Sequence, residues 1–275
     1  EANEAYEVPN QYLFGSELLV APITRPAERS TLMGSVTAWL PAGTWVDLFT
    51  GRVYDGDRRL HLHRDLTTIP VLAPAGAILP LDGRTVPGNG TANPEHLEVV
   101  VVVGADGAFD LVEDDDATTS EVTTTPLHFE QAAGRLTVGP AAGPRDELPA
   151  VRRWTVTFLA VAEPLTISVT VDGESVAHRV ERTATGTSIV VDAVPIGAGL
   201  AVEIGADPRL RANDVALGVF EVLNRAQIEH EMKTTALAAA TGGRSLAQRI
   251  SDLDAIGLDP AVVRAVAEVL LARAE

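Results

Sequence analysis

The sequence contains no cysteine, few aromatic residues and no long apolar run. With Cys at zero, disulfides, thiolate metal sites and cysteine nucleophiles are excluded. Aromatic side chains make up only 4% of the 275 residues, so platforms for stacking a ligand are scarce. No apolar stretch reaches the roughly 18 residues that a membrane-spanning helix needs, and residues 1–10 lack the order of a signal peptide. We therefore expect no membrane partner and a cytoplasmic location.

Positive charge is also scarce. The chain has 21 Lys and Arg residues against 38 Asp and Glu residues, and its formal net charge is −17. Such a charge repels a phosphate backbone, so we expect no nucleic acid partner. Hydrophobic residues nevertheless make up 46% of the chain, which is enough to bury a sizeable core.

The first part of the chain is predicted to be a β-sandwich. The 23 Gly and 17 Pro residues of the whole chain divide the sequence into short segments, which favours many strands over a few helices. We expect strands at residues 17–23, 35–41, 45–50, 59–66, 68–74 and 77–81. Glycine and proline then accumulate without an apolar period, which is typical of a linker. The expected ranges are 1–82 for this sandwich and 83–94 for the linker.

A second antiparallel β-sandwich is expected at residues 95–205. Residues 165–172 alternate between apolar and polar side chains, as a half-buried strand does. Segments of similar length and spacing lie at 96–103, 109–112, 136–138, 154–161, 188–194 and 200–204. Asp172 and Gly173 are typical of a hairpin turn. The fold class is thus mostly β, with two consecutive sandwich domains.

The last segment, residues 206–275, is predicted to be a short α-helical extension. Apolar residues recur at helical spacing from Asn213, the expected N-cap, towards Gly242. Ser245 begins a capping box that starts a second helix, and Asp259 followed by Pro260 starts a third. We therefore expect three helices in this extension.

No catalytic, cofactor-binding or metal-binding residue emerges from the motifs. No Ser lies in a Gly-x-Ser-x-Gly elbow, and the segment 197–199, which begins like a dinucleotide-binding motif, is better explained as a hairpin turn. His61 and His63 would face the same side of a strand, as two metal ligands do. A third ligand is not evident and several arginines lie nearby, so solvated surface is favoured over a metal site.

Three further features have both a functional and a structural interpretation. The acidic run from Glu113 to Asp116 could bind calcium, but it lacks the Ca²⁺-binding loop pattern, so a solvated turn is favoured. Sugar rings could stack on exposed tryptophans, but core packing is the better interpretation of Trp39, Trp45 and Trp154. Residues 89–91 form a glycosylation sequon that is more simply a turn.

Several strings resemble the region that follows the catalytic barrel in glycoside hydrolase family 31. Residues 11–23 read Q-Y-L-F-G-S-E-L-L-V-A-P-I, residues 39–51 read W-L-P-A-G-T-W-V-D-L-F-T-G, and residues 69–80 read I-P-V-L-A-P-A-G-A-I-L-P. All three are similar to elements of that family, and they occur in its order. Residues 109–120 are similar to a turn of the family's distal β-domain, except that Asp116 stands where Gly is usual. The resemblance covers residues 1 to about 205.

The resemblance implies a non-catalytic part of a larger enzyme. Family members hydrolyse α-glycosidic bonds with two Asp residues on the loops of a (β/α)8 barrel, and neither matches a position of this chain. Because the sequence begins with Glu rather than Met, we expect residues upstream. The expected partner is thus an upstream catalytic barrel of the same polypeptide, and the chain alone is expected to be inactive. No cofactor is expected.

Two alternative functions remain open from the sequence. The distal sandwich could bind carbohydrate, although the few aromatic residues argue against this. The helical extension could instead form a homo-oligomer through an apolar stripe that contains Val262, Val266, Val269 and Leu270. Packing of the stripe within its own chain explains the pattern equally well.

Overall fold

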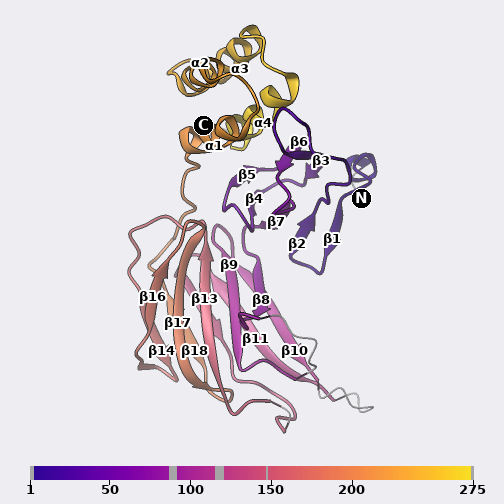
Figure 1. Cartoon of the computed structure of the whole chain (residues 1–275). Coiled ribbons are helices and arrows are strands. Elements are labelled where there is room, and N and C mark those ends of the chain that lie inside the picture. The colour runs from indigo at the N-terminus through magenta and orange to yellow at the C-terminus, as the bar shows by residue number, and fades with distance from the viewer. Residues whose placement is uncertain (1–2, 87–91, 115–120, 147, 274–275) are drawn as a thin grey trace. The chain divides into compact units, whose positions relative to one another are not determined.

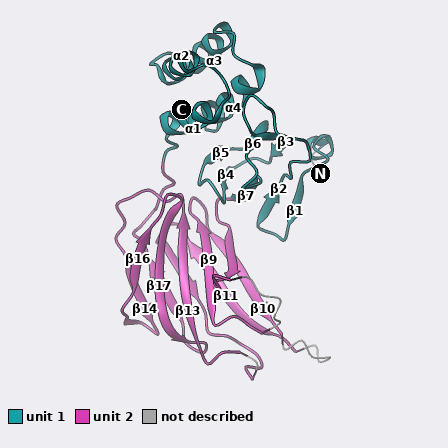
Figure 2. Cartoon of the chain, in the orientation of Figure 1, with its two compact units in different colours: residues 1–73, 212–275 teal, residues 74–211 magenta. Residues whose placement is uncertain are grey.

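The computed structural model describes residues 3–86, 92–114, 121–146 and 148–273, and the chain forms two compact units. The first unit combines residues 1–73 with residues 212–275, and the second comprises residues 74–211 (Figures 1 and 2). The architecture is mostly β with helices at the C-terminal end, as expected. The boundaries of these units differ from those of the four expected ranges. The helical extension belongs to the same unit as the first β-region.

The β-part of the first unit contains a five-stranded sheet and a two-stranded ladder. The sheet has the order β1-β2-β7-β4-β5 and the ladder pairs β3 with β6. Their bounds are β1 (Tyr12–Phe14), β2 (Leu18–Val20), β3 (Gly34–Leu40), β4 (Thr44–Asp47), β5 (Val53–Asp55), β6 (Arg58–Arg64) and β7 (Val71–Pro74). A short 3-10 helix, Asn3–Glu7, precedes them. Alternating side chains of these strands form a core that includes Leu19, Leu40, Trp45, Tyr54, Leu62 and Leu72. The strands β1 and β5 are additions to the expected ones.

The described residues of the C-terminal extension form four helices, rather than the three expected: α1 (Val215–Arg225), α2 (His230–Thr241), α3 (Leu246–Ala255) and α4 (Pro260–Leu271). The capping box at Ser245 and the start at Asp259 and Pro260 are both present. The apolar faces share one core, which includes Val219, Leu223, Ala236, Leu253, Val262, Val266 and Val269. No described helix combines the length and apolar character that crossing a membrane requires.

The expected long helix from Asn213 is wrong in two respects. Its first half is capped by Asp214, whose carboxylate accepts from the backbone N–H of Leu217 at 2.9 Å. The amide of Asn213 instead pairs with both backbone groups of Val53, at 2.9 and 2.8 Å. The helix then ends at Arg225, and the N–H of Gln227 donates to the carbonyl of Ser30 at 2.7 Å. Tertiary hydrogen bonds therefore replace the helical ones that the periodicity predicts.

The second unit is a sandwich of two sheets. One has the order β10-β11-β12-β18-β14-β15 and the other β16-β17-β13-β9-β8. The bounds are β8 (Ile78–Asp82), β9 (His96–Val102), β10 (Gly107–Glu113), β11 (Thr123–Glu130), β12 (Arg135–Val138), β13 (Val151–Leu159), β14 (Ser168–Val171), β15 (Glu174–Ser175), β16 (Arg179–Arg182), β17 (Gly186–Pro195) and β18 (Leu200–Glu203). Buried residues of both sheets form its core, in which the rings of Phe129 and Phe158 lie 6.0 Å apart.

Local features of this unit include one that was expected and two that differ from expectation. Asp172 and Gly173 have positive φ angles of 49° and 85° and join β14 to β15 as the expected hairpin. In contrast, β9 and β13 pair in parallel, so the sandwich is not wholly antiparallel. The chain leaves β9, passes through β10, β11 and β12 of the other sheet, and returns in its original direction. Strand β8, expected in the first domain, pairs with β9 and so belongs here.

Candidate functional site

The acidic run begins with a buried ion pair rather than a solvated turn. The carboxylate of Glu113 is 5% exposed and accepts two hydrogen bonds from Arg152, at 2.7 and 2.6 Å. Since Arg152 occupies both carboxylate oxygens, Glu113 is not placed to bind a calcium ion. Asp114 is exposed, and Asp115 and Asp116 lie outside the described residues. The expectation of a solvated Glu113 was therefore wrong, because a partner 39 residues away was not apparent from spacing.

The two histidines of β6 have different surroundings. His61 is exposed, and its Nδ1 lies 3.2 Å from the hydroxyl of Thr37. His63 is buried and hydrogen bonds to Glu268 of α4, so the expected solvated surface is wrong for this residue. Within the described ranges, no group of three or more His, Cys, Asp or Glu residues is placed to hold a metal ion.

The tryptophans and the 197–199 segment have structural rather than functional surroundings. Trp45 and Trp154 are 7% and 4% exposed, and Trp39 is half-buried. The 197–199 segment joins β17 to β18, which belong to different sheets, so it is a connection between sheets and not the expected hairpin. The 89–91 sequon lies outside the described residues.

A buried ionic cluster joins α4 to the β-part of the first unit. One oxygen of Glu268 accepts from the hydroxyl of Tyr54 at 2.8 Å and from Arg64 at 2.9 Å. The other accepts from the backbone N–H of His63 at 2.6 Å and from its ring Nδ1 at 2.9 Å. Arg64 continues to Asp47 at 2.7 Å. We call these five residues the Glu268 cluster.

The electrostatics of the Glu268 cluster favour its charged form. Burial by itself would raise the pKa of Glu268, but the charges of Arg64 and Arg52 and the hydrogen bond from His63 lower it from 4.5 to about 2. Burial raises the pKa of the Tyr54 hydroxyl above its usual range, so it stays a neutral donor. Glu268 therefore stays charged and Tyr54 stays a neutral donor, which suits a structural joint.

Further polar contacts hold the helices to the same β-part. The carbonyl of Ala272 accepts from the N–H of Asp55 at 2.9 Å and from Arg58 at 2.5 Å. Arg225 at the end of α1 forms an ion pair with Asp65 at 2.7 Å. The helical extension is thus attached through α1 and α4 by specific polar contacts.

A cleft of about 580 Å³ opens beside the Glu268 cluster. The β-part contributes Met33, Thr50, Arg52, His63, Arg64, Asp65, Thr67 and Thr68, and the helices contribute Gly218, Phe220, Glu221, Val222, Asn224, Arg225 and Glu268. Its polar groups include guanidinium, carboxylate, hydroxyl and amide groups. Phe220, on the helical wall of the cleft, is 50% exposed.

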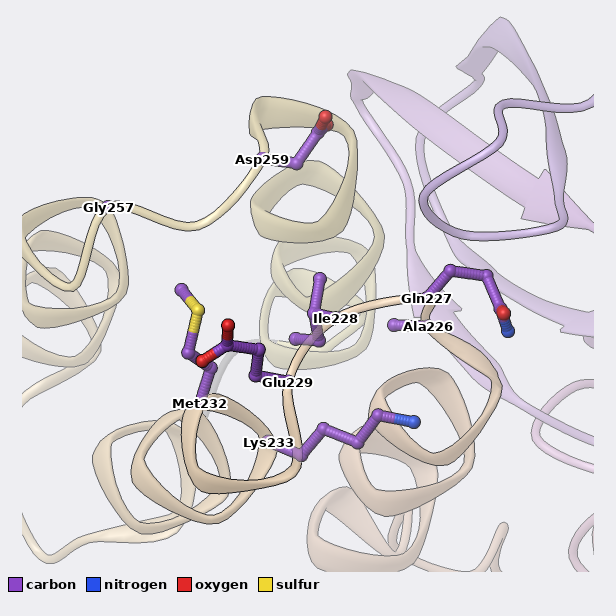
Figure 3. A pocket seen from close by; sticks show the side chains of 8 residues that line it. All are labelled: Ala226, Gln227, Ile228, Glu229, Met232, Lys233, Gly257 and Asp259. Atoms are coloured by element: carbon purple, nitrogen blue, oxygen red, sulfur yellow. The ribbon is translucent and has the colours of Figure 1, made fainter.

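A second pocket, of about 730 Å³, lies wholly among the helices (Figure 3). Two of its polar side chains have structural roles. Asp259 accepts from the N–H of Ala261 at 2.8 Å as the cap of α4, and Lys233 donates to the carbonyl of Asn224 at 2.9 Å. Nothing in this pocket resembles a reacting pair of side chains.

The strand β1 exposes large apolar side chains at the edge of its sheet. Tyr12, Leu13 and Phe14 are 49%, 69% and 63% exposed, and Tyr6 just before them is 76% exposed. Since β1 is the end strand of the β1-β2-β7-β4-β5 sheet, no strand of the described residues pairs with the other side of its backbone. An apolar edge strand of this kind is typical of a surface that a partner covers.

Comparison with known proteins agrees with the motifs. Residues 1–79 match the sequence model of the glycosyl hydrolase family 31 C-terminal domain. The α-xylosidase of Saccharolobus solfataricus is 29% identical over 143 residues, which are 50% of this chain and 19% of the relative. The α-glucosidase 2 of Bacillus thermoamyloliquefaciens is 29% identical over 116 residues, or 42% of this chain and 14% of the relative. The resemblance found in the sequence is confirmed.

Solved structures show the same fold. The cycloalternan-forming enzyme of Listeria monocytogenes superposes with a TM-score of 0.55 at 24% identity, over 76% of this chain and 20% of that one. A family 31 dextranase of Flavobacterium johnsoniae gives a TM-score of 0.57 at 19% identity, over 74% and 28%. The chain spans about a fifth or less of the length of the two curated relatives.

Proposed function

We propose that this chain is the non-catalytic C-terminal part of a retaining α-glycosidase of family 31, and that residues 1–73 support the catalytic barrel of the same polypeptide. The observation that carries the proposal is the exposed apolar strand β1. It lies inside the segment that matches the family's C-terminal domain. A barrel packed on Tyr12, Leu13 and Phe14 would cover both the side chains and the open strand edge.

The surroundings of the acidic residues support a non-catalytic role. Retaining hydrolysis needs two carboxyl groups about 5 Å apart, one of which has a raised pKa so that it can donate a proton. Glu268 is buried and its pKa is lowered, which is the opposite of what a general acid needs. Glu113 is held by Arg152. Support for the barrel, rather than chemistry, is therefore the role that we propose.

The two alternative functions are less well supported by the structure. The stripe of Val262, Val266, Val269 and Leu270 is buried among the helices of its own chain, so pairing between subunits through these residues would require the helices to separate. A carbohydrate site on the distal sandwich would need an exposed aromatic platform, whereas Trp154 is buried there. Oligomerisation, the cytoplasmic location and the four domain ranges stay predictions.

The test measures whether β1 behaves as an uncovered surface. We expect residues 1–275 to bind the dye ANS in the folded state and to associate with rising concentration in light scattering. A Leu13→Ser, Phe14→Ser variant should lose most of both effects. Val86→Ser, which changes a side chain that is 75% exposed in the second unit, is the control and should retain them. A monomer that binds no dye would contradict the proposal.

A further inference from the structure

The cleft beside the Glu268 cluster has a feature that a structural joint does not require. On one side it is lined by the hydrogen-bonded charged residues of the Glu268 cluster. Elsewhere it is lined by side chains that are partly or largely exposed. Arg52 is 18% exposed, lies 3.6 Å from Glu268 and hydrogen bonds with Tyr54. Because a guanidinium has five N–H donors, others remain for a ligand. Helix α1 lines the cleft from Gly218 onwards. On this helix Phe220 is half exposed, and Asn224, about two turns after Gly218, is exposed as well.

The charges that line the cleft are balanced. Arg52, Arg64 and Arg225 are matched by Asp65, Glu221 and Glu268. Arg64 and Arg225 are moreover already paired, with Asp47 and Asp65. A phosphate or carboxylate ligand would therefore be repelled by the carboxylates of the cleft as well as attracted by its guanidinium groups. A cationic ligand would likewise be attracted by the carboxylates and repelled by the guanidinium groups. The balance favours a neutral ligand that forms hydrogen bonds.

We propose that this cleft binds a neutral polyhydroxylated molecule, a short saccharide, with one ring packed on Phe220. A hydroxyl group donates and accepts hydrogen bonds at once. A ligand hydroxyl can therefore accept a hydrogen bond from Arg52 and donate one to a carboxylate of the cleft or to the amide oxygen of Asn224. A group that only accepts hydrogen bonds cannot use both kinds of partner. The less polar face of a sugar ring complements the face of Phe220.

Size and position are consistent with this ligand. The cleft of about 580 Å³ falls within the roughly 300–1,000 Å³ of small-molecule sites. It is built by the helical extension together with the β-part, and none of residues 12–14 lines it. The proposal thus stands apart from the support of the barrel and from the alternative site on the distal sandwich.

The test is titration of residues 1–275 with glucose, xylose and maltotriose, followed by calorimetry and by saturation-transfer NMR. Inorganic phosphate is titrated in parallel. We compare Phe220→Ala and Asn224→Ala with the control Leu217→Ala, because Leu217 is 51% exposed on the same helix but does not line the cleft. Circular dichroism checks that each variant is folded.

We expect at least one of the sugars to bind, and both cleft variants to weaken that binding by roughly tenfold, equivalent to about 1.4 kcal/mol. The Leu217→Ala variant should bind like the wild type. The proposal is overturned if none of the sugars binds, if binding is the same in Phe220→Ala and Asn224→Ala as in wild type, or if phosphate binds and the sugars do not.

Discussion

The substitution Glu268→Gln tests how the helical extension is held to the β-part. It keeps the shape of the side chain but removes its charge, so Arg64 loses one of its two carboxylate partners in a buried site. Breaking a buried ion pair by removing one partner typically costs about 3–5 kcal/mol, because the remaining charge is left uncompensated. We expect the free energy of unfolding of the first unit to fall by a similar amount at neutral pH.

The pH dependence of this effect has a definite sign. The pKa of Glu268 is lowered from 4.5 to about 2 in the folded chain, which corresponds to about 3 kcal/mol of stabilisation of the charged form. A lowered carboxyl pKa contributes stability that is complete above pH 4.5 and is lost as the pH falls to about 2. The difference between wild type and Glu268→Gln should therefore be largest at neutral pH and shrink across this acidic range.

The assay is urea unfolding followed by tryptophan fluorescence in a Trp154→Phe background. Of the three tryptophans, only Trp39 and Trp45 of the first unit then remain. Glu221→Gln, a change at an exposed position of α1, serves as the control and should alter stability by less than about 0.5 kcal/mol. A Glu268→Gln variant as stable as this control, or a difference that does not change with pH, would refute the reasoning.

Three further outcomes are expected. In a Trp39→Phe, Trp45→Phe background, where only Trp154 of the second unit remains, urea unfolding followed by fluorescence should show that Arg152→Ala destabilises this unit by about 3–5 kcal/mol. Loss of the exposed pair of Arg153 with Asp192 in Arg153→Ala should cost less than about 1 kcal/mol, and equal effects would contradict this. Gly218→Ala should lower the melting temperature, because a Cβ there would lie 2.8 Å from Val269, while Gly243→Ala, with nothing within 4 Å, should not. Purified residues 1–275 should not hydrolyse nitrophenyl α-glucoside or α-xyloside, and turnover that is lost when residues 113–116 are all changed to Ala would make the chain an enzyme.

Features determined by neighbouring residues could be predicted from the sequence. Ser245 and Gln248 form their capping box within one turn, and Asp259 with Pro260 starts a helix by local chemistry alone. The Asp172 and Gly173 hairpin likewise depends on residues that tolerate positive φ. In each case the physical cause lies within a few residues of its effect, so a single sequence contains it.

Features determined by distant partners could not be predicted. Glu268 and His63 are 205 residues apart, and no spacing rule joins an acid in a helix to a histidine in a strand at that distance. The break after α1 depends on a bond from Gln227 to Ser30. Strand β11 lies outside the expected segments for another reason: Pro126 interrupts its otherwise alternating pattern, and proline usually argues against a strand.

The most direct test of the proposed support of a barrel is amide hydrogen exchange at Tyr12, Leu13 and Phe14. Exchange is compared between residues 1–275 and the complete polypeptide that the gene encodes. If a barrel covers the open edge of β1, exchange should be slower in the complete polypeptide at those of the three amides that point to this edge, while the amides of the second unit's core strands change little. Equal exchange at β1 in both proteins would contradict the account.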